Sequence, residues 1–472
     1  MKKIALLFLI LSSLLLFTNC TKTTTLQSNN KNPPIQTQNN TNTLDSIPEY
    51  TEKPEETDQK IDTDLPKDTE ESPQETEKPI TPDTPNRNVL NFKNMKAMWL
   101  SQFDFFSIYT NNDSQRNETD FRNKIKTVLK NVKESGCNTI IVQLRPYADS
   151  FYPSEYYPPS RYVTGNYSNN FSYDPIKIIV DEAHKINLSV HGWFNPLRAM
   201  TPSEIKSVND KYQIKQWYND TQKNGSYLVE YNNRYYLNPA YEDVRGLIIN
   251  GVKEIITKYN IDGVHMDDYF YPTTSESFDM SAYNDYKSNG GTMTLREFRF
   301  NCLNKLVSGI YSTVKSVDTR LLYGISPEGI ITNSIDNAFA DIYTWCSNDG
   351  YIDYICPQVY FGFEHQAFPF DKACEKWEDV VKNKNVKLII GLTLGKAQEK
   401  YDKWAGSGAY EWKNNTDILK RCLEYTKNLD KCTGVAFFCY QYYYSPDTFA
   451  DVIETRAERD NFIPVLKEIS WN

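Results

Sequence analysis

Eight short apolar or β-branched runs, separated by stretches with helical periodicity, constrain the fold of this chain more than any other feature. They lie at residues 97–103, 139–144, 188–194, 263–267, 321–326, 354–360, 386–394 and 434–440. Eight strand–helix units within about 380 residues predict an α/β fold with one parallel (β/α)8 TIM barrel. The alternative, an open doubly wound sheet, normally has a Gly-rich phosphate loop after its first strand, and this sequence has none there.

The N-terminus has the pattern of an export signal. Lys2 and Lys3 precede an apolar run over residues 4–17, which ends at Thr18, Asn19 and Cys20. A basic start and an apolar run of this length are typical of a secretory signal, and the run is too short for a spanning helix. Cys20, just after the apolar run, resembles the acylation site of bacterial lipoproteins. We therefore expect an exported protein that is lipid-anchored through Cys20 and faces outward, with simple secretion as the alternative.

The segment that follows is polar and strongly acidic. Residues 44–85 carry fourteen acidic residues and four lysines, whereas the whole chain has a net charge of −9. Such a composition cannot bury enough apolar surface to offset its chain entropy. We divide the chain into a signal peptide (1–20), a disordered tether (21–90) and the barrel (91–472). Because the barrel has no basic surplus, we expect no nucleic-acid partner and membrane contact through the anchor alone.

Cysteine and histidine usage argues against a disulfide framework and against catalytic zinc. Eight cysteines follow Cys20, none of them in a CxxC pair, and several lie within apolar runs. Only four histidines exist, without the spacing of a zinc site. We therefore expect buried free cysteines, no metal site and no cofactor, although an Asp/Glu-bound calcium stays open.

The strongest local signal for chemistry is the segment 262–272, DGVHMDDYFYP. Strand alternation places Val264 and Met266 toward the helices and His265 and Asp267 toward the barrel axis, with Asp268 at the strand end. Adjacent acids that end an apolar strand are costly unless they pair, cap a helix, bind metal or do chemistry. In a TIM barrel the carboxyl ends of the strands form the active site. Asp267 and Asp268 are therefore candidate catalytic residues, with a capping acid and a buried ion pair as the structural alternative.

Other strand ends supply candidate partners for this pair. Neutral donors and acceptors, stacking aromatics and ionisable groups of the kind that bind sugars follow these strands. They are Arg145, His191, Trp193, Asn195, His265, Gln358, Tyr360, Glu364 and Tyr440, with Glu328 just past the fifth strand. We expect Arg145 and His265 to hold the Asp267 carboxylate ionised. The longest loop, residues 195–238, contains a predicted hairpin that turns at Asn232 and Asn233, and loops of this length usually form functional walls or lids.

Six sequence blocks carry a family resemblance that covers about residues 95–463. They are 145–146 (RP), 192–196 (GWFNP), 236–240 (YLNPA), 262–272, 323–327 (YGISP) and 353–360 (DYICPQVY). With these blocks the chain resembles the glycosyl-hydrolase-like family ten, a family of bacterial surface lipoproteins. The resemblance implies a (β/α)8 fold and, for members with known activity, hydrolysis of peptidoglycan glycan strands that have lost their peptides.

Glycoside hydrolysis generally needs two carboxyl groups that flank the bond. We expect Asp267 to be the nucleophile or base and Glu328 the proton donor, an arrangement that also resembles α-amylase-type barrels. Asp268 and Glu364 are alternative acids. We expect a monomer that acts on a polysaccharide substrate. Two competing functions are a non-catalytic glycan-binding barrel and a metal-dependent hydrolase or deacetylase.

Overall fold

The computed structural model describes residues 87–472, so the predicted signal peptide, Cys20 anchor and most of the tether lie outside the described residues. Eight parallel strands close into a barrel in the order β1-β12-β11-β10-β9-β8-β5-β4. Their bounds are β1 Met95–Leu100, β4 Thr139–Arg145, β5 Ser189–Phe194, β8 Gly263–Met266, β9 Leu322–Ile325, β10 Tyr354–Ile355, β11 Lys387–Thr393 and β12 Cys432–Phe438. Every predicted run overlaps one of these strands, and the predicted TIM barrel is confirmed.

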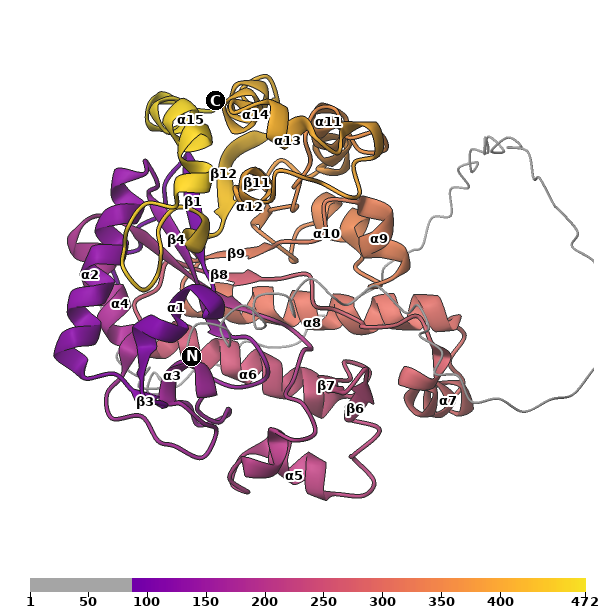
Figure 1. Cartoon of the computed structure of the whole chain (residues 1–472). Coiled ribbons are helices and arrows are strands. Elements are labelled where there is room, and N and C mark those ends of the chain that lie inside the picture. Colours follow the sequence, from indigo (N-terminus) through magenta and orange to yellow (C-terminus); the bar gives the residue numbers. More distant parts are fainter. Residues whose placement is uncertain (1–86) are drawn as a thin grey trace, which may run out of the picture. The chain divides into compact units, whose positions relative to one another are not determined.

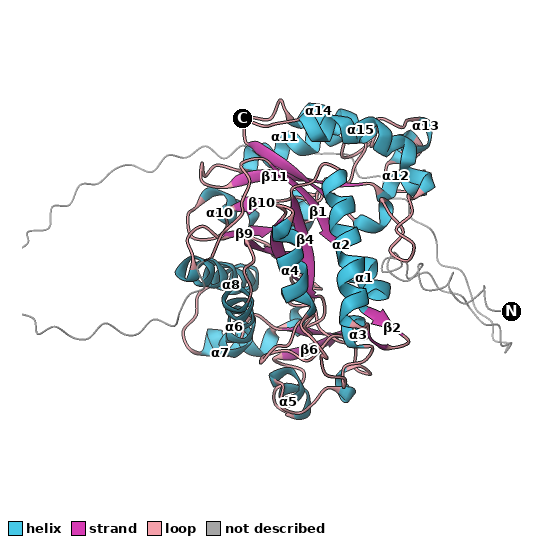
Figure 2. Cartoon of the chain, turned by 90° about the vertical axis from the view of Figure 1, so that its left-hand side faces the viewer, coloured by secondary structure: helices cyan, strands magenta, loops and turns pink. Residues whose placement is uncertain are grey.

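Helices surround the strands on the outside of the barrel (Figures 1 and 2). The longer ones are α1 Gln102–Tyr109, α2 Glu118–Glu134, α4 Pro175–Lys185, α6 Glu242–Lys258, α7 Met280–Ser288, α8 Leu295–Val317, α11 Phe370–Val380, α14 Ile418–Thr426 and α15 Arg456–Glu468. The shorter ones are α3 Arg161–Thr164, α5 Gln213–Asn219, α9 Ile331–Asp336, α10 Ile342–Ser347, α12 Gly395–Glu399 and α13 Glu411–Asn414. No helix within residues 87–472 is long and apolar enough to cross a membrane.

Local sequence explains where these helices begin and which face they bury. Asn117 caps α2 by accepting hydrogen bonds from the next turn, and the buried positions of α2 recur at helical spacing from Phe121 to Val132. Thr294 and Glu297 form a reciprocal capping box at the start of α8. The helices therefore pack their apolar faces against the outer surface of the barrel.

Strand alternation separates the barrel interior from the layer beneath the helices. Val264 and Met266 of β8 belong to the large core between strands and helices. A smaller cluster that includes Trp99, Trp193 and Tyr354 fills the barrel interior. The predicted orientation of β8 is therefore confirmed, and it directs His265 and then Asp267 toward the barrel axis.

The long segment between β5 and α6 forms a separate wall at the carboxyl end of the strands. It contains α5 and the hairpin of β6 Leu228–Tyr231 and β7 Arg234–Leu237. Asn232 and Asn233 turn the hairpin with φ angles of 49° and 59°, a conformation that asparagine tolerates better than most residues. The predicted hairpin is confirmed, and we call the segment 195–241 the lid segment.

Candidate active site

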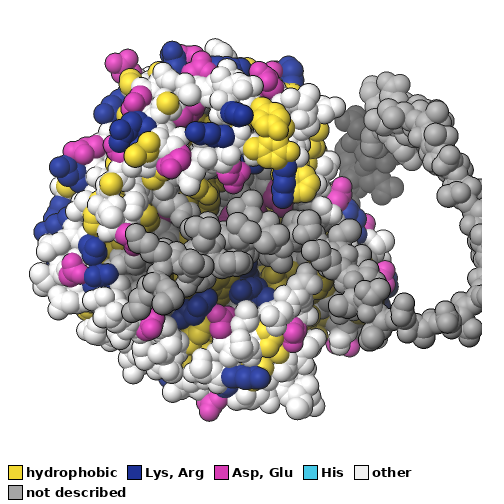
Figure 3. All heavy atoms as spheres, viewed as in Figure 1, with side chains coloured by type: hydrophobic (Ala, Val, Ile, Leu, Met, Phe, Trp, Pro, Cys, Tyr) yellow, Lys and Arg dark blue, Asp and Glu magenta, His cyan; other side chains and the backbone are white. Residues whose placement is uncertain are grey.

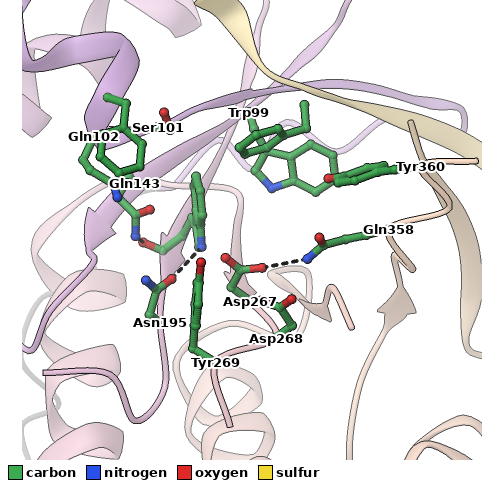
Figure 4. Close-up of a pocket in the computed structure, with 13 residues that line it drawn as sticks. Trp99, Ser101, Gln102, Gln143, Asn195, Asp267, Asp268, Tyr269, Gln358 and Tyr360 are labelled. Atoms are coloured by element: carbon green, nitrogen blue, oxygen red, sulfur yellow. Dashed lines mark hydrogen bonds between the residues drawn. The ribbon is translucent and has the colours of Figure 1, made fainter. Parts of the chain in front are cut away.

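A pocket opens at the carboxyl ends of the barrel strands, above the interior cluster (Figure 4). Its lining combines aromatic rings, side-chain amides and two carboxyl groups from several different strand ends. The lining residues are Trp99, Ser101, Gln102, Phe103, Gln143, Trp193, Asn195, Asp267, Asp268, Tyr269, Gln358, Tyr360 and Phe438. Six of the predicted site residues, Trp193, Asn195, Asp267, Asp268, Gln358 and Tyr360, are therefore brought together here.

Asp267 lines the pocket, and the residue is only 8% exposed. The amide Nε2 of Gln358 donates a hydrogen bond of 3.1 Å to its Oδ1 atom. Burial raises the pKa of Asp267 to about 6, although the Trp193 indole and the positive charge of Arg198 act in the opposite direction. The group can therefore gain or lose a proton close to neutral pH.

Asp268 interacts directly with Asp267, and both residues line the pocket (Figure 4). Limited contact with water raises the pKa of Asp268 well above its ordinary value, and the negative charges of Asp267 and Glu328 raise it further. Two carboxyl groups this close cannot both ionise easily, so they titrate as a pair. Within the pair, burial and the neighbouring negative charges favour the protonated form of Asp268.

The remaining lining offers surfaces that suit a sugar ring. Trp193 Nε1 donates to Asn195 Oδ1 at 3.1 Å, and Asn195 Nδ2 donates to the Pro146 carbonyl at 2.9 Å. These bonds fix the orientation of both side chains. Trp99 and Tyr360 present aromatic rings around the same space, while Gln143 adds an amide (Figure 4). Flat rings beside fixed donors and acceptors allow stacking on a sugar and hydrogen bonding to its hydroxyl groups.

Both predicted histidines lie below the pocket, inside the barrel. Tyr354 Oη is 3.0 Å from His191 Nδ1 and 2.9 Å from His265 Nδ1. Trp99 Nε1 donates to His265 Nε2 at 3.3 Å, and burial lowers the pKa of both histidines. Because they are neutral and bonded to other groups, neither residue lines the pocket or holds Asp267 ionised, which corrects the prediction for both.

Arg145 also differs from its predicted role. Its guanidinium donates to the Tyr157 hydroxyl and to the Asn195 carbonyl, and it lies over the rings of Tyr157 and Phe194. The side chain is 2% exposed and faces the helix layer rather than Asp267. The positive charge that acts on Asp267 comes instead from Arg198 of the lid segment.

Three further predicted residues lie outside the pocket lining. Tyr440 is fully buried and accepts a hydrogen bond from Asn131, so it offers no stacking face to a ligand. Glu364 is exposed beyond the short strand β10, where its backbone N–H donates to Glu411. Glu328 is exposed at the end of β9, close enough to Asp268 for its charge to raise that pKa. Glu328 therefore borders the site, whereas Tyr440 and Glu364 do not.

The motif search missed Gln143 and Phe438 as pocket residues and Arg198 as a neighbour. Gln143 is the inward-facing residue two positions before Arg145, so alternation could have found it. Arg198 lies three residues beyond Asn195 within the lid segment, and no local pattern marks its position. All eight cysteines of residues 87–472 are buried and unpaired, and no group of three or more His, Cys, Asp or Glu side chains in this range could hold a metal ion.

Known proteins with similar sequences carry hydrolase names. Glycosyl hydrolase YngK of Bacillus subtilis (strain 168) is 33% identical over 303 residues, which span 60% of this chain and 58% of YngK. Glycosyl hydrolase DigH of Escherichia coli O6:H1 is 28% identical over 387 residues, which span 75% of this chain and 84% of DigH. The match therefore spans somewhat more than half the length of YngK.

Among solved structures, the glycoside hydrolase domain of PgaB (BpsB) from Bordetella bronchiseptica aligns with a TM-score of 0.46 and 11% identity, over 78% of this chain and 99% of that domain. The profile of the family described as Glycosyl hydrolase-like 10 matches residues 94–405, which include β1 through β11 and all the carboxylates of the site. This match supports a hydrolase that acts on glycans. The chain belongs to the glycosyl hydrolase-like 10 family.

Proposed function

We propose that this protein is a glycoside hydrolase that cleaves peptidoglycan glycan strands lacking their peptides. The observation that carries the proposal is the directly interacting pair Asp267–Asp268, with raised pKa values, in an aromatic and amide-lined pocket at the strand ends. Groups tuned to exchange protons near neutral pH are what acid-assisted cleavage of a glycosidic bond requires. The substrate class rests on what the family resemblance implies.

In this proposal Asp268 donates the proton to the leaving oxygen. Its pKa is raised by burial and by the two neighbouring negative charges of Asp267 and Glu328, which favours the protonated form that a proton donor needs. A carboxylic acid kept neutral in this way is the usual proton donor of glycosidases. Asp268 therefore takes the acid role that the sequence analysis assigned first to Glu328.

Asp267 and Glu328 are assigned the two other roles in the reaction, charge stabilisation and nucleophilic or base catalysis. Two carboxyl groups that interact directly are closer than the roughly 5 Å that separates acid and nucleophile in a retaining enzyme. We therefore assign Asp267 to stabilising the positive charge that develops on the sugar ring. Glu328, the third carboxylate at this rim, is assigned as the base or nucleophile, and Trp99, Trp193, Asn195 and Gln358 as sugar-binding residues.

The cellular location is also part of the proposal. The N-terminal sequence supports export, removal of residues 1–19 and acylation of Cys20 as the new N-terminus. A tether over residues 21–90 would let a monomeric barrel reach glycan strands at some distance from the outward-facing membrane surface.

Digestion of defined glycan strands tests the activity. The purified chain is incubated with peptide-free and with peptide-bearing strands, and the products are analysed by mass spectrometry for new reducing ends. We expect cleavage of peptide-free strands and its loss in Asp268→Asn, with Glu364→Gln as an exposed control acid outside the pocket. Strands that co-sediment with the protein but stay intact would instead identify a non-catalytic binding barrel.

A substrate with an activated leaving group tests the assignment of the acid. An aryl glycoside needs little protonation of its leaving group, so loss of the acid should matter much less there than on a glycan strand. We expect Asp268→Asn to retain far more activity on the aryl glycoside than on strands, and Glu328→Gln to lose activity on both. The reverse pattern would make Glu328 the acid.

A further inference from the structure

Two arginine side chains of the lid segment share one aromatic neighbour, and one of the two also stacks on a residue that lines the pocket. The Cζ atom of Arg198 is 5.0 Å from the ring centroid of Tyr147, and that of Arg234 is 4.3 Å from the same ring. Arg198 also lies over Tyr269, at 4.3 Å, and Tyr269 lines the pocket. Stacking on tyrosine fixes the guanidinium planes while leaving their N–H edges available.

Much of the hydrogen-bonding capacity of these arginines is unused. The Nε atom of Arg198 is buried without a partner, and Arg234 donates only to the Ala199 carbonyl, at 2.7 Å. Within residues 87–472 neither side chain forms an ion pair, whereas Arg161 nearby pairs with Glu204 at 3.0 Å. A buried guanidinium N–H without an acceptor is costly, so Arg198 is suited to an acceptor that arrives with a ligand. Arg234, on the same tyrosine ring, has further N–H groups to offer.

Arg198 lies near the carboxyl pair, although the two belong to different elements. The charge of Arg198 lowers the pKa of Asp267, which places the two groups within electrostatic reach of each other. Lys and Arg side chains are also visible on the face of the molecule shown in Figure 3. A ligand in the pocket would thus meet acid chemistry from β8 and positive charge from the lid segment.

We propose that Arg198 and Arg234 bind a carboxylate carried by the sugar in the pocket. This inference rests on the proposed function, under which the group is the free lactyl carboxylate of a muramic acid residue. In a peptide-bearing strand the same carbon is part of an amide, which has no negative charge and cannot accept the paired N–H bonds of a guanidinium. Recognition of this carboxylate would explain a preference for peptide-free strands without any steric barrier to the peptide.

A matched pair of substrates isolates the charge. Peptide-free strands are compared with the same strands after their lactyl carboxylates have been converted to methylamides, a change that is small in size and removes the charge. We expect kcat/KM of the unsubstituted protein to be about 10- to 100-fold higher on the free carboxylate, as for other charge-assisted hydrogen bonds. Equal rates on both substrates would overturn the inference and leave the proposed function standing, whereas cleavage of neither would overturn both.

Variants then assign the effect to the two side chains. Arg198→Gln and Arg234→Gln should each lower kcat/KM on the free-carboxylate strands and leave kcat/KM on the methylamide strands unchanged. The ratio of the two kcat/KM values should therefore fall. Arg198→Lys should restore part of it, because lysine keeps the charge but not the paired donors. Arg296→Gln is the control, since Arg296 also stacks on an aromatic ring but pairs with Asp336 and belongs to α8 instead of the lid segment.

Two further results complete the test. Thermal unfolding of each variant shows whether it is folded. A folded variant whose kcat/KM falls equally on both substrates would contradict carboxylate binding. A linear polyuronate, whose carboxylates belong to the sugar ring, is the second substrate source. If the protein cleaves polyuronate and this cleavage depends on Arg198, the carboxylate-binding site stands, but its ligand is a uronate and not muramic acid.

Discussion

The barrel interior contains two polar regions only two residues apart along β8, and they differ in how their charge is managed. Around His265 every polar group has a partner: the Trp99 indole donates to His265, and Tyr354 links His265 to His191. Around Asp267 the carboxyl group has one amide donor from Gln358 and a second carboxyl group beside it. The first region is neutral and closed, and the second keeps a charge at the edge of an open pocket.

The shifts in pKa show the same contrast. Burial lowers the pKa of His191 to about 4 and raises that of Asp267 to about 6. Burial opposes charge in both regions, but only Asp267 remains ionised at neutral pH. The position of an inward polar residue along the strand therefore decides whether it lies in the closed core or in the pocket, and residue type alone does not.

Of the three substitutions at Asp267, His191 and His265, Asp267→Asn should have the largest effect on activity. We expect kcat/KM on peptide-free strands to fall by about 10²- to 10³-fold, the range for loss of a group that stabilises charge in the transition state. The same change should raise the free energy of unfolding at pH 7, by up to about 3 kcal/mol. Steady-state kinetics and urea unfolding measure the two effects.

The direction of the stability change follows from proton binding. The folded-state pKa of Asp267 lies above its ordinary value of 3.8, so folding is favoured where the group is protonated, and this advantage is lost as pH rises through about 6. At pH 7 the unsubstituted protein carries the full cost of a buried charge, which asparagine avoids. The stability difference should therefore vanish near pH 3.8, and an unchanged difference at both pH values would contradict this account.

His191 should show the opposite pH dependence. Its folded-state pKa of about 4 lies below the ordinary value of 6.5, so its contribution to stability is fully present above pH 6.5 and is lost as pH falls toward 4. The loss should reach about 3 kcal/mol over this interval. Urea unfolding of the unsubstituted protein and of His191→Gln, compared at pH 7 and pH 4.5, measures it. A variant whose stability falls as steeply as that of the unsubstituted protein would exclude His191 as the source.

His265→Phe should have the smallest effect of the three and should act on stability rather than activity. The change leaves the buried Trp99 N–H without an acceptor and removes one of the two partners of Tyr354. We expect the free energy of unfolding to fall by about 1 to 3 kcal/mol. Activity per folded molecule should change far less than in Asp267→Asn, and a loss of equal size would remove the distinction between the two regions.

Sequence reasoning recovered the fold because the strands and helices carry strong periodic signals. The eight runs, the alternation of β8 and the hairpin at Asn232 and Asn233 all depend on local chemistry. The carboxyl pair was also found locally, since two acids ending an apolar strand are costly without a reason. These are the features for which neighbours in sequence determine the outcome.

The errors arose where the end of a strand was misplaced or a partner was distant in sequence. β12 ends at Phe438 rather than at residue 440, so Tyr440 turns into the helix layer. β10 covers only Tyr354–Ile355, and the chain beyond it carries Glu364 away from the pocket. Arg145 was matched to Asp267 by charge alone, but its nearest acceptors are Tyr157 and the Asn195 carbonyl.

Titration of the aspartate carboxyl carbons by ¹³C NMR tests the central claim most directly. Spectra of the chain labelled at aspartate are recorded from pH 3 to pH 9, and Asp267→Asn and Asp268→Asn assign the two signals. We expect Asp267 to titrate at about pH 6 and Asp268 at a higher pH. In Asp267→Asn, loss of the neighbouring charge should lower the pKa of Asp268. Two carboxyl groups that both titrate near the ordinary value of 3.8, independently of each other, would contradict the account of this pocket as an acid–base site.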